Sequence, residues 1–516
     1  MGNPSAIPAK KLSWREDTRA RLARDRFDVL VIGGGINGAG IARDAALRGL
    51  SVALIERGDF ASGTSSRSSR LVHGGVRYLE HGFFHLVFES SRERRILLEI
   101  APHLVKPLRF TWPVYEGARI PKWKLNAGLW LYDLLAAFRN VARHHSLNAA
   151  QVLATEPKLK RDGLRGGAIY YDASTNDARL TIANVVDAVS AGAAALNYAE
   201  AISLSFDGAR ASGASVRDQF TQQIFEVRAK CVVNATGPWT DAISRIENPS
   251  SPAAVLGTKG VHIAVPADRV GNRAAVTMLA HADQRVMFVL PGATHTIIGT
   301  TDTETNERPD QVRATRGDVN YLLDAANSYF PDAKLTTDDV VCAWAGIRPL
   351  IASGNAGDPA GASREQAITV GLRGVIAVTG GKLTTYRSMS EEVVDRVESC
   401  LGKPRTKSDT ATRPLPGSAI RPADVDWRSA VLVAGLPYTT ADVSDAAGHE
   451  FACTVADVLV RRTHLAFETR DHGVSVAPRV AEILASRLGW SAAGIARELA
   501  NYRAEVARLF TIDDAE

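Results

Sequence analysis

Short apolar runs and helical periodicity alternate near the start of the sequence. Residues 27–32 form a β-rich apolar run that ends in glycines, and residues 36–49 have helical spacing with small residues on the inward face. Residues 51–56 supply the next strand pattern. This strand–helix–strand order predicts a parallel βαβ unit, so we expect a doubly wound α/β domain.

The middle of the chain is rich in strand patterns. The run at residues 225–234 is followed by shorter apolar runs at residues 261–265, 285–290 and 296–299, which are typical of an antiparallel sheet. A later buried run at residues 375–378 leads into a helical pattern and returns the chain to the first domain. The sequence therefore predicts a sheet domain inserted into the α/β domain.

Three regions follow from these patterns. We expect a basic N-terminal arm at residues 1–26, a discontinuous nucleotide-binding domain over residues 27–402 with an inserted antiparallel-sheet substrate domain mainly within residues 250–340, and a linker with a C-terminal helical domain over residues 403–516. The arm carries seven lysines and arginines without a following apolar core. It is expected to be solvated, with a targeting or membrane-surface role as the alternative.

Composition narrows the class of protein. The 516 residues are 45% hydrophobic and 23% charged, which indicates a globular chain rather than a disordered one. The four cysteines are scattered without a CxxC pair, so we expect neither a disulfide framework nor a metal site, and a reducing compartment fits. No apolar run reaches the roughly 18 residues of a bilayer span, which predicts a protein that is soluble or bound to one membrane face.

A glycine fingerprint opens the first predicted helix. Gly33, Gly35 and Gly38 match the GxGxxG pattern between a strand and a helix, and Glu56 ends the second strand 21 residues after Gly35. The glycines allow a tight turn, close approach to a pyrophosphate and close helix packing, while the acid accepts from ribose hydroxyls. The sequence therefore predicts a dinucleotide site.

FAD suits this site better than NAD. A polar, glycine-bearing loop at residues 56–66 follows the fingerprint where a nicotinamide enzyme would usually continue its βα alternation. Two other strand ends, at residues 234–237 and 379–382, carry glycines and would converge on the same crevice. Three segments around one cofactor favour an extended flavin dinucleotide.

Seven stretches, in order, resemble one family. They are VIGGGINGAGIA at residues 31–42, LVHGGVRYLE at 71–80, NATGPW at 234–239, KGVH at 259–262, IGTTD at 298–302, GIRPL at 346–350 and GGKLTTYR at 380–387. Over residues 27–400 the chain closely resembles the aerobic FAD-dependent glycerol-3-phosphate dehydrogenases, within the D-amino-acid-oxidase-like flavoprotein superfamily. One position departs from the usual pattern, since Gln366 follows Arg364 and Glu365 where relatives often have histidine.

The resemblance implies a reaction and its residues. It implies oxidation of sn-glycerol 3-phosphate to dihydroxyacetone phosphate, with hydride passing from C2 to flavin N5 and electrons passing on to a membrane quinone. The implied cofactor contacts are Gly33, Gly35, Asn37, Gly38, Glu56, Thr64, Ser65, Ser66, His73, Gly74, Gly75, Thr236, Gly237, Gly381, Lys382, Leu383 and Thr384. The implied substrate contacts are Arg77, Tyr78, Arg348, Arg364 and Lys382, because guanidinium groups hold a phosphate dianion well.

His262 is the first candidate for the catalytic base, assisted by Arg348. A base must lie within hydrogen-bond reach of the C2 hydroxyl, and we expect the nearby Lys259 to disfavour the protonated imidazole. The neighbouring arginines would also stabilise a developing alkoxide. His73 is expected to contact the cofactor or to hold its loop.

Residues 119–145 mix aromatic and basic side chains as a helix in the head-group plane of a membrane does. We therefore expect a cytoplasmic protein bound peripherally to the inner face of the cytoplasmic membrane. The alternative is a helix that packs on the protein with a basic rim.

Three other functions stay open. A glycerophosphate oxidase would use the same substrate site and oxygen as acceptor, whereas an amino-acid oxidase would need a single carboxylate-binding arginine in place of a cluster. A flavin-bound nucleic-acid-binding or scaffold protein fits the net charge of +5, but basic motifs interleaved with aromatic residues are missing, so we expect no nucleic acid partner. Monomer and homodimer are both open.

Overall fold

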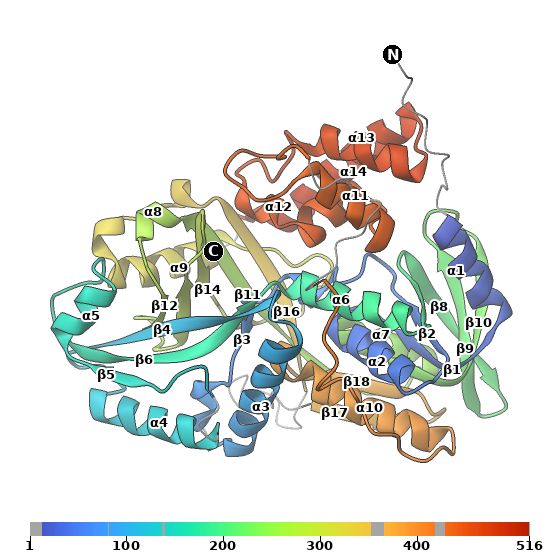
Figure 1. The fold of residues 1–516 in the computed structure, drawn as a ribbon, viewed down its shortest axis with the longest axis horizontal. Coiled ribbons are helices and arrows are strands. Elements are labelled where there is room, and N and C mark those ends of the chain that lie inside the picture. Colours follow the sequence, from blue (N-terminus) through green and yellow to red (C-terminus); the bar gives the residue numbers. More distant parts are fainter. Residues whose placement is uncertain (1–12, 81, 137–139, 352–365, 418–428, 515–516) are drawn as a thin grey trace.

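The computed structural model describes residues 13–80, 82–136, 140–351, 366–417 and 429–514. Its strands form two sheets that lie side by side, and helices of the C-terminal region lie above the junction between them (Figure 1). This arrangement confirms the expected fold class: a doubly wound α/β domain, a second sheet domain and a C-terminal helical domain.

The first sheet has parallel strands at its centre. Its order is β17-β18-β10-β1-β2-β7; β9 also pairs with β10, and β8 pairs with β9. β1 lies parallel to both β10 and β2. The strands are β1 (Arg26–Ile32), β2 (Val52–Ile55), β7 (Ala194–Leu196), β8 (Ala199–Asp207), β9 (Arg210–Asp218), β10 (Ile224–Asn234), β17 (Gln366–Val370) and β18 (Ile376–Gly380). Buried valine and isoleucine on both strand faces explain why the sheet is covered on both sides.

Helices cover both faces of this sheet. Apolar side chains of α2 (Ile36–Leu47), α6 (Asp177–Ser190) and α10 (Tyr386–Cys400) pack on one face. The opposite face packs against α1 (Ser13–Arg24) and α7 (Thr240–Glu247). Because β1, β10 and β18 are parallel, their carboxyl ends meet at one edge of the sheet, where the glycine-bearing loops begin.

The second sheet takes strands from two parts of the chain. They are β3 (Leu71–Val72), β4 (Val105–Tyr115), β5 (His145–Leu147), β6 (Leu164–Thr175), β11 (Val255–Pro266), β12 (Ala275–Leu279), β13 (Val286–Leu290), β14 (His295–Gly299), β15 (Thr303–Glu304) and β16 (Cys342–Ile351). Most neighbours are antiparallel, but β12 pairs with β4 in parallel. The expected range of 250–340 thus covers only part of the sheet, because the long β4–β6 pair extends it.

Five helices accompany the second sheet. They are α3 (Phe84–Ile100), α4 (Lys122–Leu135), α5 (Ala149–Thr155), α8 (Ala267–Val270) and α9 (Arg316–Tyr329). Val319, Leu322 and Ala326 of α9 pack on Val261 and Ile263 of β11 and form the centre of this core. Because α9 covers one face of β11, the other face is left for the site.

The N-terminal region is not a solvated arm throughout. Over residues 13–24 it forms α1, which packs on β10 and β7. Leu22 is fully buried, and the Arg15 guanidinium donates to Asn197 O (2.7 Å) and Asp218 Oδ2 (3.1 Å). The prediction was wrong here because a basic helix can bury its apolar stems and pair its charges. Residues 1–12 lie outside the described residues.

The C-terminal region is helical, as expected. It contains α11 (Thr440–His449), α12 (Leu465–Glu468), α13 (Ala477–Leu488), α14 (Ala492–Phe510) and a π-helix at Asp457–Arg462. Their apolar side chains share a core with Cys342 and Trp344 of β16. This contact holds the helical domain against the second sheet. No helix in the described part of the chain combines the length and apolar character needed to cross a bilayer.

A cofactor and substrate cavity

A cavity of about 1240 Å³ lies where the two sheets meet the C-terminal helices. The dinucleotide fingerprint lines one part of it, and β11 and β16 line another. Its volume exceeds the range of roughly 300–1,000 Å³ that is usual for drug-sized ligands. The cavity therefore has room for a large cofactor together with a small substrate.

Close backbone contacts explain the fingerprint glycines. Gly33 has φ +108°, and a Cβ there would lie 2.7 Å from the Ala235 carbonyl oxygen at the end of β10. A Cβ on Gly38 would lie 1.8 Å from the Gly33 carbonyl oxygen. Gly33 thus allows the turn beside β10, and Gly38 allows the start of α2 to pack on that turn.

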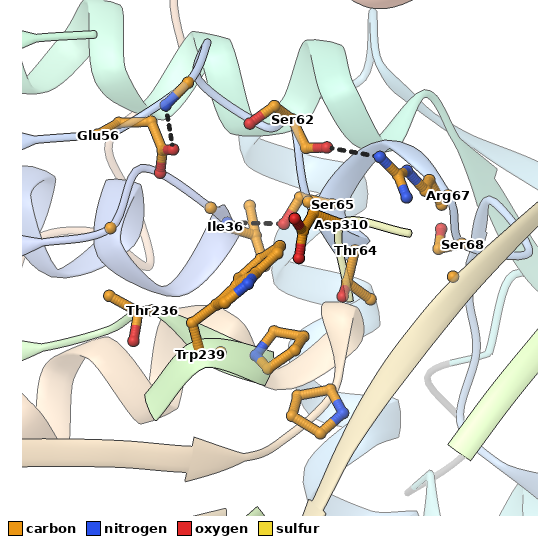
Figure 2. Close-up of a pocket in the computed structure, with 18 of the residues that line it drawn as sticks. Ile36, Glu56, Ser62, Thr64, Ser65, Arg67, Ser68, Thr236, Trp239 and Asp310 are labelled. Atoms are coloured by element: carbon orange, nitrogen blue, oxygen red, sulfur yellow. Dashed lines mark hydrogen bonds between the residues drawn. The ribbon is translucent and has the colours of Figure 1, made fainter. Parts of the chain in front are cut away.

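Glu56 and Ser65 fix the loops around the fingerprint. The Glu56 carboxylate accepts from Gly34 N (2.7 Å) and Gly58 N (2.8 Å), and the Ser65 hydroxyl accepts from Ile36 N (2.9 Å) at the start of α2 (Figure 2). Burial raises the pKa of Glu56, against these two hydrogen bonds. The carboxylate lines the cavity and keeps lone pairs for ribose hydroxyls.

Most of the expected cofactor residues converge on the cavity. Its lining includes Gly33, Gly35, Asn37, Glu56, Thr64, Ser65, His73, Thr236, Gly237, Gly381, Lys382, Leu383 and Thr384. Gly38, Ser66, Gly74 and Gly75 are absent from the lining. Gly74 instead donates its N–H to the buried Asp172 carboxylate (2.9 Å), so it supports the loop from behind.

Arg348 is fixed on β16 by groups from the 300–302 loop. Its guanidinium donates to Asp302 Oδ1 (3.0 Å), Thr300 Oγ1 (2.9 Å) and the Thr301 carbonyl oxygen (3.1 Å). Gly260, on the neighbouring β11, makes room for it, because a Cβ there would lie 2.3 Å from Arg348 Nη2. The cation is therefore held in one orientation at the cavity wall.

His262 lies two residues further along β11 and on the same face. It is 2% exposed, its ring stacks on Trp344 with centroids 5.3 Å apart, and its Nε2 lies 2.8 Å from Ser69 Oγ. Its Nδ1 has no hydrogen-bond partner among the described residues. Burial, followed by the charges of Arg348 and Arg70, lowers the pKa of His262 to about 3, so the imidazole is neutral at physiological pH.

The prediction that Lys259 disfavours the protonated imidazole of His262 is wrong. Lys259 Nζ forms an ion pair with Asp318 Oδ2 of α9 (2.8 Å). Residues three apart on a strand point to opposite faces, so Lys259 projects into the α9 core while His262 projects into the cavity. The cations that keep the imidazole neutral are Arg348 and Arg70.

Lys382 and Tyr78 meet in the same cavity. Lys382 Nζ lies 4.0 Å from the centroid of the Tyr78 ring, and this buried ammonium has no hydrogen-bond partner among the described residues. A buried cation without an acceptor favours an anionic ligand. Arg77 lies in the short helix at Val76–Leu79, but its side chain lies outside the described residues, as does all of Arg364.

Several residues of the site were not predicted from the sequence. Ser69 contacts the imidazole, Asp302 orients Arg348, and a Cβ on Gly299 would lie 2.2 Å from the His262 ring. Glycines inside strands signal close approach, so Gly260 and Gly299 carried a readable signal. Ser69 carried none, because its contact depends on tertiary packing.

Comparisons with known proteins agree with this geometry. Residues 28–387 match the family described as FAD dependent oxidoreductase, and residues 410–495 match the C-terminal domain of alpha-glycerophosphate oxidase. Glycerol-3-phosphate dehydrogenase 2 of Mycobacterium tuberculosis is 37% identical over 98% of this chain and 92% of its own. The human mitochondrial glycerol-3-phosphate dehydrogenase is 36% identical over 90% of this chain and 71% of its own.

A solved structure shares the whole architecture. The glycerol-3-phosphate dehydrogenase from Bacillus halodurans, complexed with FAD, superposes with a TM-score of 0.78 at 29% identity and covers 97% of this chain and 98% of its own. The Gly33–Gly38 turn, the start of α2 and the polar 62–66 loop are the groups that would hold FAD here, and they fit it. The chain belongs to the FAD-dependent glycerol-3-phosphate dehydrogenases.

Proposed function

We propose that this protein oxidises sn-glycerol 3-phosphate to dihydroxyacetone phosphate and passes the electrons to a membrane quinone. The observation that carries the substrate assignment is the presence of two cations in the lining of one cavity. Lys382 offers a buried ammonium for which the described part of the chain provides no acceptor, and Arg348 offers a guanidinium fixed by Asp302. Both line the cavity that the cofactor segments also line.

These cations suit a phosphate dianion. Arg348 donates in a fixed orientation, and Lys382 adds a point charge from the loop after β18. Asp302 forms ion pairs with both Arg348 (3.0 Å) and Arg285 (3.0 Å), so this carboxylate is shared between two guanidinium groups. Tyr78 adds an aromatic surface beside Lys382. Arg77 and Arg364 stay proposed contacts of the same phosphate.

His262 is proposed to take the C2 hydroxyl proton. The neutral imidazole can accept a proton without first losing one, and its contact with Ser69 holds the ring. Binding of a dianion nearby would raise its pKa from the low value set by burial and the two arginines. When bound, FAD supplies the hydride-accepting N5.

The first test is anaerobic bleaching of the flavin absorbance. The FAD-loaded protein is mixed with sn-glycerol 3-phosphate, with glycerol and a D-amino acid as controls. We expect rapid bleaching by the phosphorylated substrate alone, because the cations of Arg348 and Lys382 select its phosphate. Bleaching by glycerol at a similar rate, or by the amino acid, would reject the substrate assignment.

The electron acceptor is proposed from an exposed apolar surface on α3 and α4. Trp123, Trp130 and Leu134 recur at helical spacing on α4 with exposed fractions of 74%, 55% and 58%, and Phe84 and Phe88 are exposed on α3. We call these five side chains the apolar face. The two helices contact each other along the lower edge of the molecule as drawn in Figure 1. Exposed apolar side chains on two helices that contact each other favour a lipid or protein contact.

This position supports quinone as the acceptor. Both helices contact the short helix Val76–Leu79, which carries Tyr78 into the cavity wall. Two exposed basic residues, Lys124 within α4 and Arg119 just before it, would meet lipid head groups, although Arg119 also pairs with Glu80 (3.1 Å). We therefore propose peripheral attachment to the cytoplasmic side of the membrane. Residues 137–139 of the predicted amphipathic segment lie outside the described residues.

Vesicle binding tests the proposed attachment. The double variant Trp123→Ser/Trp130→Ser is compared with wild type for sedimentation with vesicles of phosphatidylethanolamine and phosphatidylglycerol. We expect its affinity to fall at least about tenfold while anaerobic bleaching is kept. The matched control Leu372→Ser changes another exposed apolar residue, 83% exposed on a different surface, and should bind as wild type does. Equal binding of all three proteins would reject this face.

The oxygen-using alternative is tested in the same material. Turnover with sn-glycerol 3-phosphate is measured with a soluble quinone without oxygen, and with oxygen without quinone. We expect quinone turnover to exceed peroxide formation. Peroxide formation at the faster rate would instead identify a glycerophosphate oxidase. This alternative is tested because residues 410–495 match the C-terminal domain of alpha-glycerophosphate oxidase.

A further inference from the structure

Two cysteines that are far apart in the sequence meet behind the cofactor sheet. Cys231 lies in β10 and is 1% exposed, whereas Cys400 is the last residue of α10 and is partly exposed. Both belong to the apolar core between β10 and α10. Each thiol shifts the pKa of the other, which indicates that the two sulfur atoms lie close together, and Cys400 is the one that is partly exposed.

An arginine activates the outer thiol. Arg210, an exposed residue at the start of β9, donates from Nη2 to Cys400 Sγ over 2.8 Å. The Cys231 thiol and then the Arg210 guanidinium lower the pKa of Cys400 to about 6, although burial opposes them. The Cys400 thiol, with burial, raises the pKa of Cys231. Cys400 is partly exposed and contacts Arg210, so it is the nucleophile, and the buried Cys231 is its neutral neighbour.

The other two cysteines provide a contrast. Cys342 and Cys453 are buried, and burial raises the pKa of both, that of Cys453 to about 12. No second cysteine is a hydrogen-bond partner of either one in the described chain. Such thiols are inert toward mild oxidants, so they serve as internal controls.

We propose that Cys231 and Cys400 form a reversible disulfide when the protein meets a peroxide. The Cys400 thiolate attacks one peroxide oxygen, so an S–O bond forms, the O–O bond breaks and hydroxide leaves. Cys231 then gives up its proton and attacks the Cys400 sulfur, so the S–S bond forms and the sulfenic oxygen leaves as water. Two thiols and hydrogen peroxide thus give one disulfide and two waters.

The disulfide would tie together two supports of the cofactor. β10 ends at Asn234, directly before the Thr236–Gly237 turn, and α10 begins at Tyr386, directly after the Gly381–Thr384 segment. A covalent link between strand and helix restricts their separation. We therefore expect slower FAD release and a higher thermal unfolding midpoint in the oxidised protein, with thiol reductant reversing both changes.

Peptide mapping tests the link directly. The FAD-loaded protein is treated with a small excess of hydrogen peroxide, and its unreduced peptides are analysed by mass spectrometry. We expect a peptide that joins Cys231 to Cys400 and disappears on reduction. Peroxide treatment that leaves both thiols free, or that carries wild-type Cys400 to sulfinic acid without the link, would overturn the proposal.

Alkylation rates and variants separate activation from simple exposure. At pH 7 iodoacetamide should label Cys400 at least about tenfold faster than Cys342 and Cys453, because a pKa near 6 makes most of it thiolate. Arg210→Met, an exposed change, should slow this labelling several-fold and leave FAD content unchanged. Cys231→Ser should stop the link and allow over-oxidation of Cys400, whereas Cys453→Ser should still form the link. A rate that Arg210→Met does not alter would reject the activation by Arg210.

Discussion

The two faces of β11 show how one strand serves chemistry and stability at once. One face carries Gly260 and His262 toward the cavity, beside Arg348 of β16. The other face carries Lys259 and Val261 toward α9. On the core face the single charge is matched by Asp318 at 2.8 Å. On the cavity face the imidazole lies near two arginines and forms no ion pair with a carboxylate in the described structure.

This difference separates a buried ion pair inside the core from a cation at the cavity, Arg348, whose orientation Asp302 fixes. The Lys259–Asp318 pair is buried, with side-chain exposures of 8% each, and needs nothing further. The cavity face carries the residues that we propose to bind the substrate phosphate and to take its proton. Substitutions on the two faces should therefore separate cleanly into losses of activity and losses of stability.

The largest effect is expected from His262→Asn. Removing the proposed base should lower the rate of anaerobic flavin reduction about 10²- to 10⁴-fold, while the thermal unfolding midpoint changes little. Stopped-flow absorbance with saturating sn-glycerol 3-phosphate measures this rate. A loss below about tenfold would mean that the positioned cations carry most of the catalysis and that His262 is a structural residue.

Arg348→Lys should weaken substrate recognition next. Lysine keeps the charge but loses the planar donors that Asp302 and Thr300 orient, so kcat/KM should fall about 100-fold. The split between KM and kcat shows whether the contact acts on the bound substrate or on the transition state. Unchanged kcat/KM in this variant would place the phosphate elsewhere in the cavity.

Lys259→Met should affect stability rather than activity. The change leaves the Asp318 carboxylate buried without its cation, so the free energy of unfolding should fall by about 3 kcal/mol. Denaturant unfolding of the FAD-loaded protein measures this loss. The double variant Lys259→Met/Asp318→Asn should recover part of it, because asparagine keeps the cap of α9 without an uncompensated charge. A change of kcat above about threefold would contradict the separation of the faces.

The smallest expected effect concerns pH. His262 has a folded pKa of about 3, far below the usual value of about 6.5, so between these values the unfolded chain binds a proton that the folded chain does not. Stability from this group is complete above pH 6.5 and is lost as the pH falls toward 3. Between pH 7 and 5 the loss should be about 2 kcal/mol. Over this range the unfolding free energy of the His262→Asn variant should fall less than that of the wild type. An identical pH dependence of the two proteins would contradict the assignment.

The sequence predicted the cofactor half of the site better than the substrate half. Gly33, Gly38 and Glu56 act through local backbone geometry, which a strand–turn–helix pattern specifies. The orientation of Arg348 depends instead on a loop more than 40 residues away, at Thr300 and Asp302. Contacts of that kind arise from sheet pairing, so spacing along the chain could not reveal them.

The same limit explains why the predictions for Lys259 and for the N-terminal segment failed. Lys259 lies close to His262 in sequence, yet alternation along the strand places the two side chains on opposite faces. The N-terminal segment has the composition of a solvated arm, but Arg15 forms an ion pair with Asp218, more than 200 residues away in the sequence, and α1 packs on the sheet. In both cases the partner, rather than the residue itself, determined the outcome.

The Asp59 side chain limits how independently the two matched segments of the chain can vary. It is fully buried beside the cofactor loop, and its Oδ2 forms ion pairs with Arg461 Nε (2.6 Å) and Arg462 Nη1 (2.6 Å) of the C-terminal π-helix. Burial opposes its ionisation, but the two arginines lower its pKa. Residues 28–387 and 410–495 are therefore not interchangeable modules. If the helical domain were replaced by that of a distant relative without the two arginines, the Asp59 carboxylate would be buried without a cation.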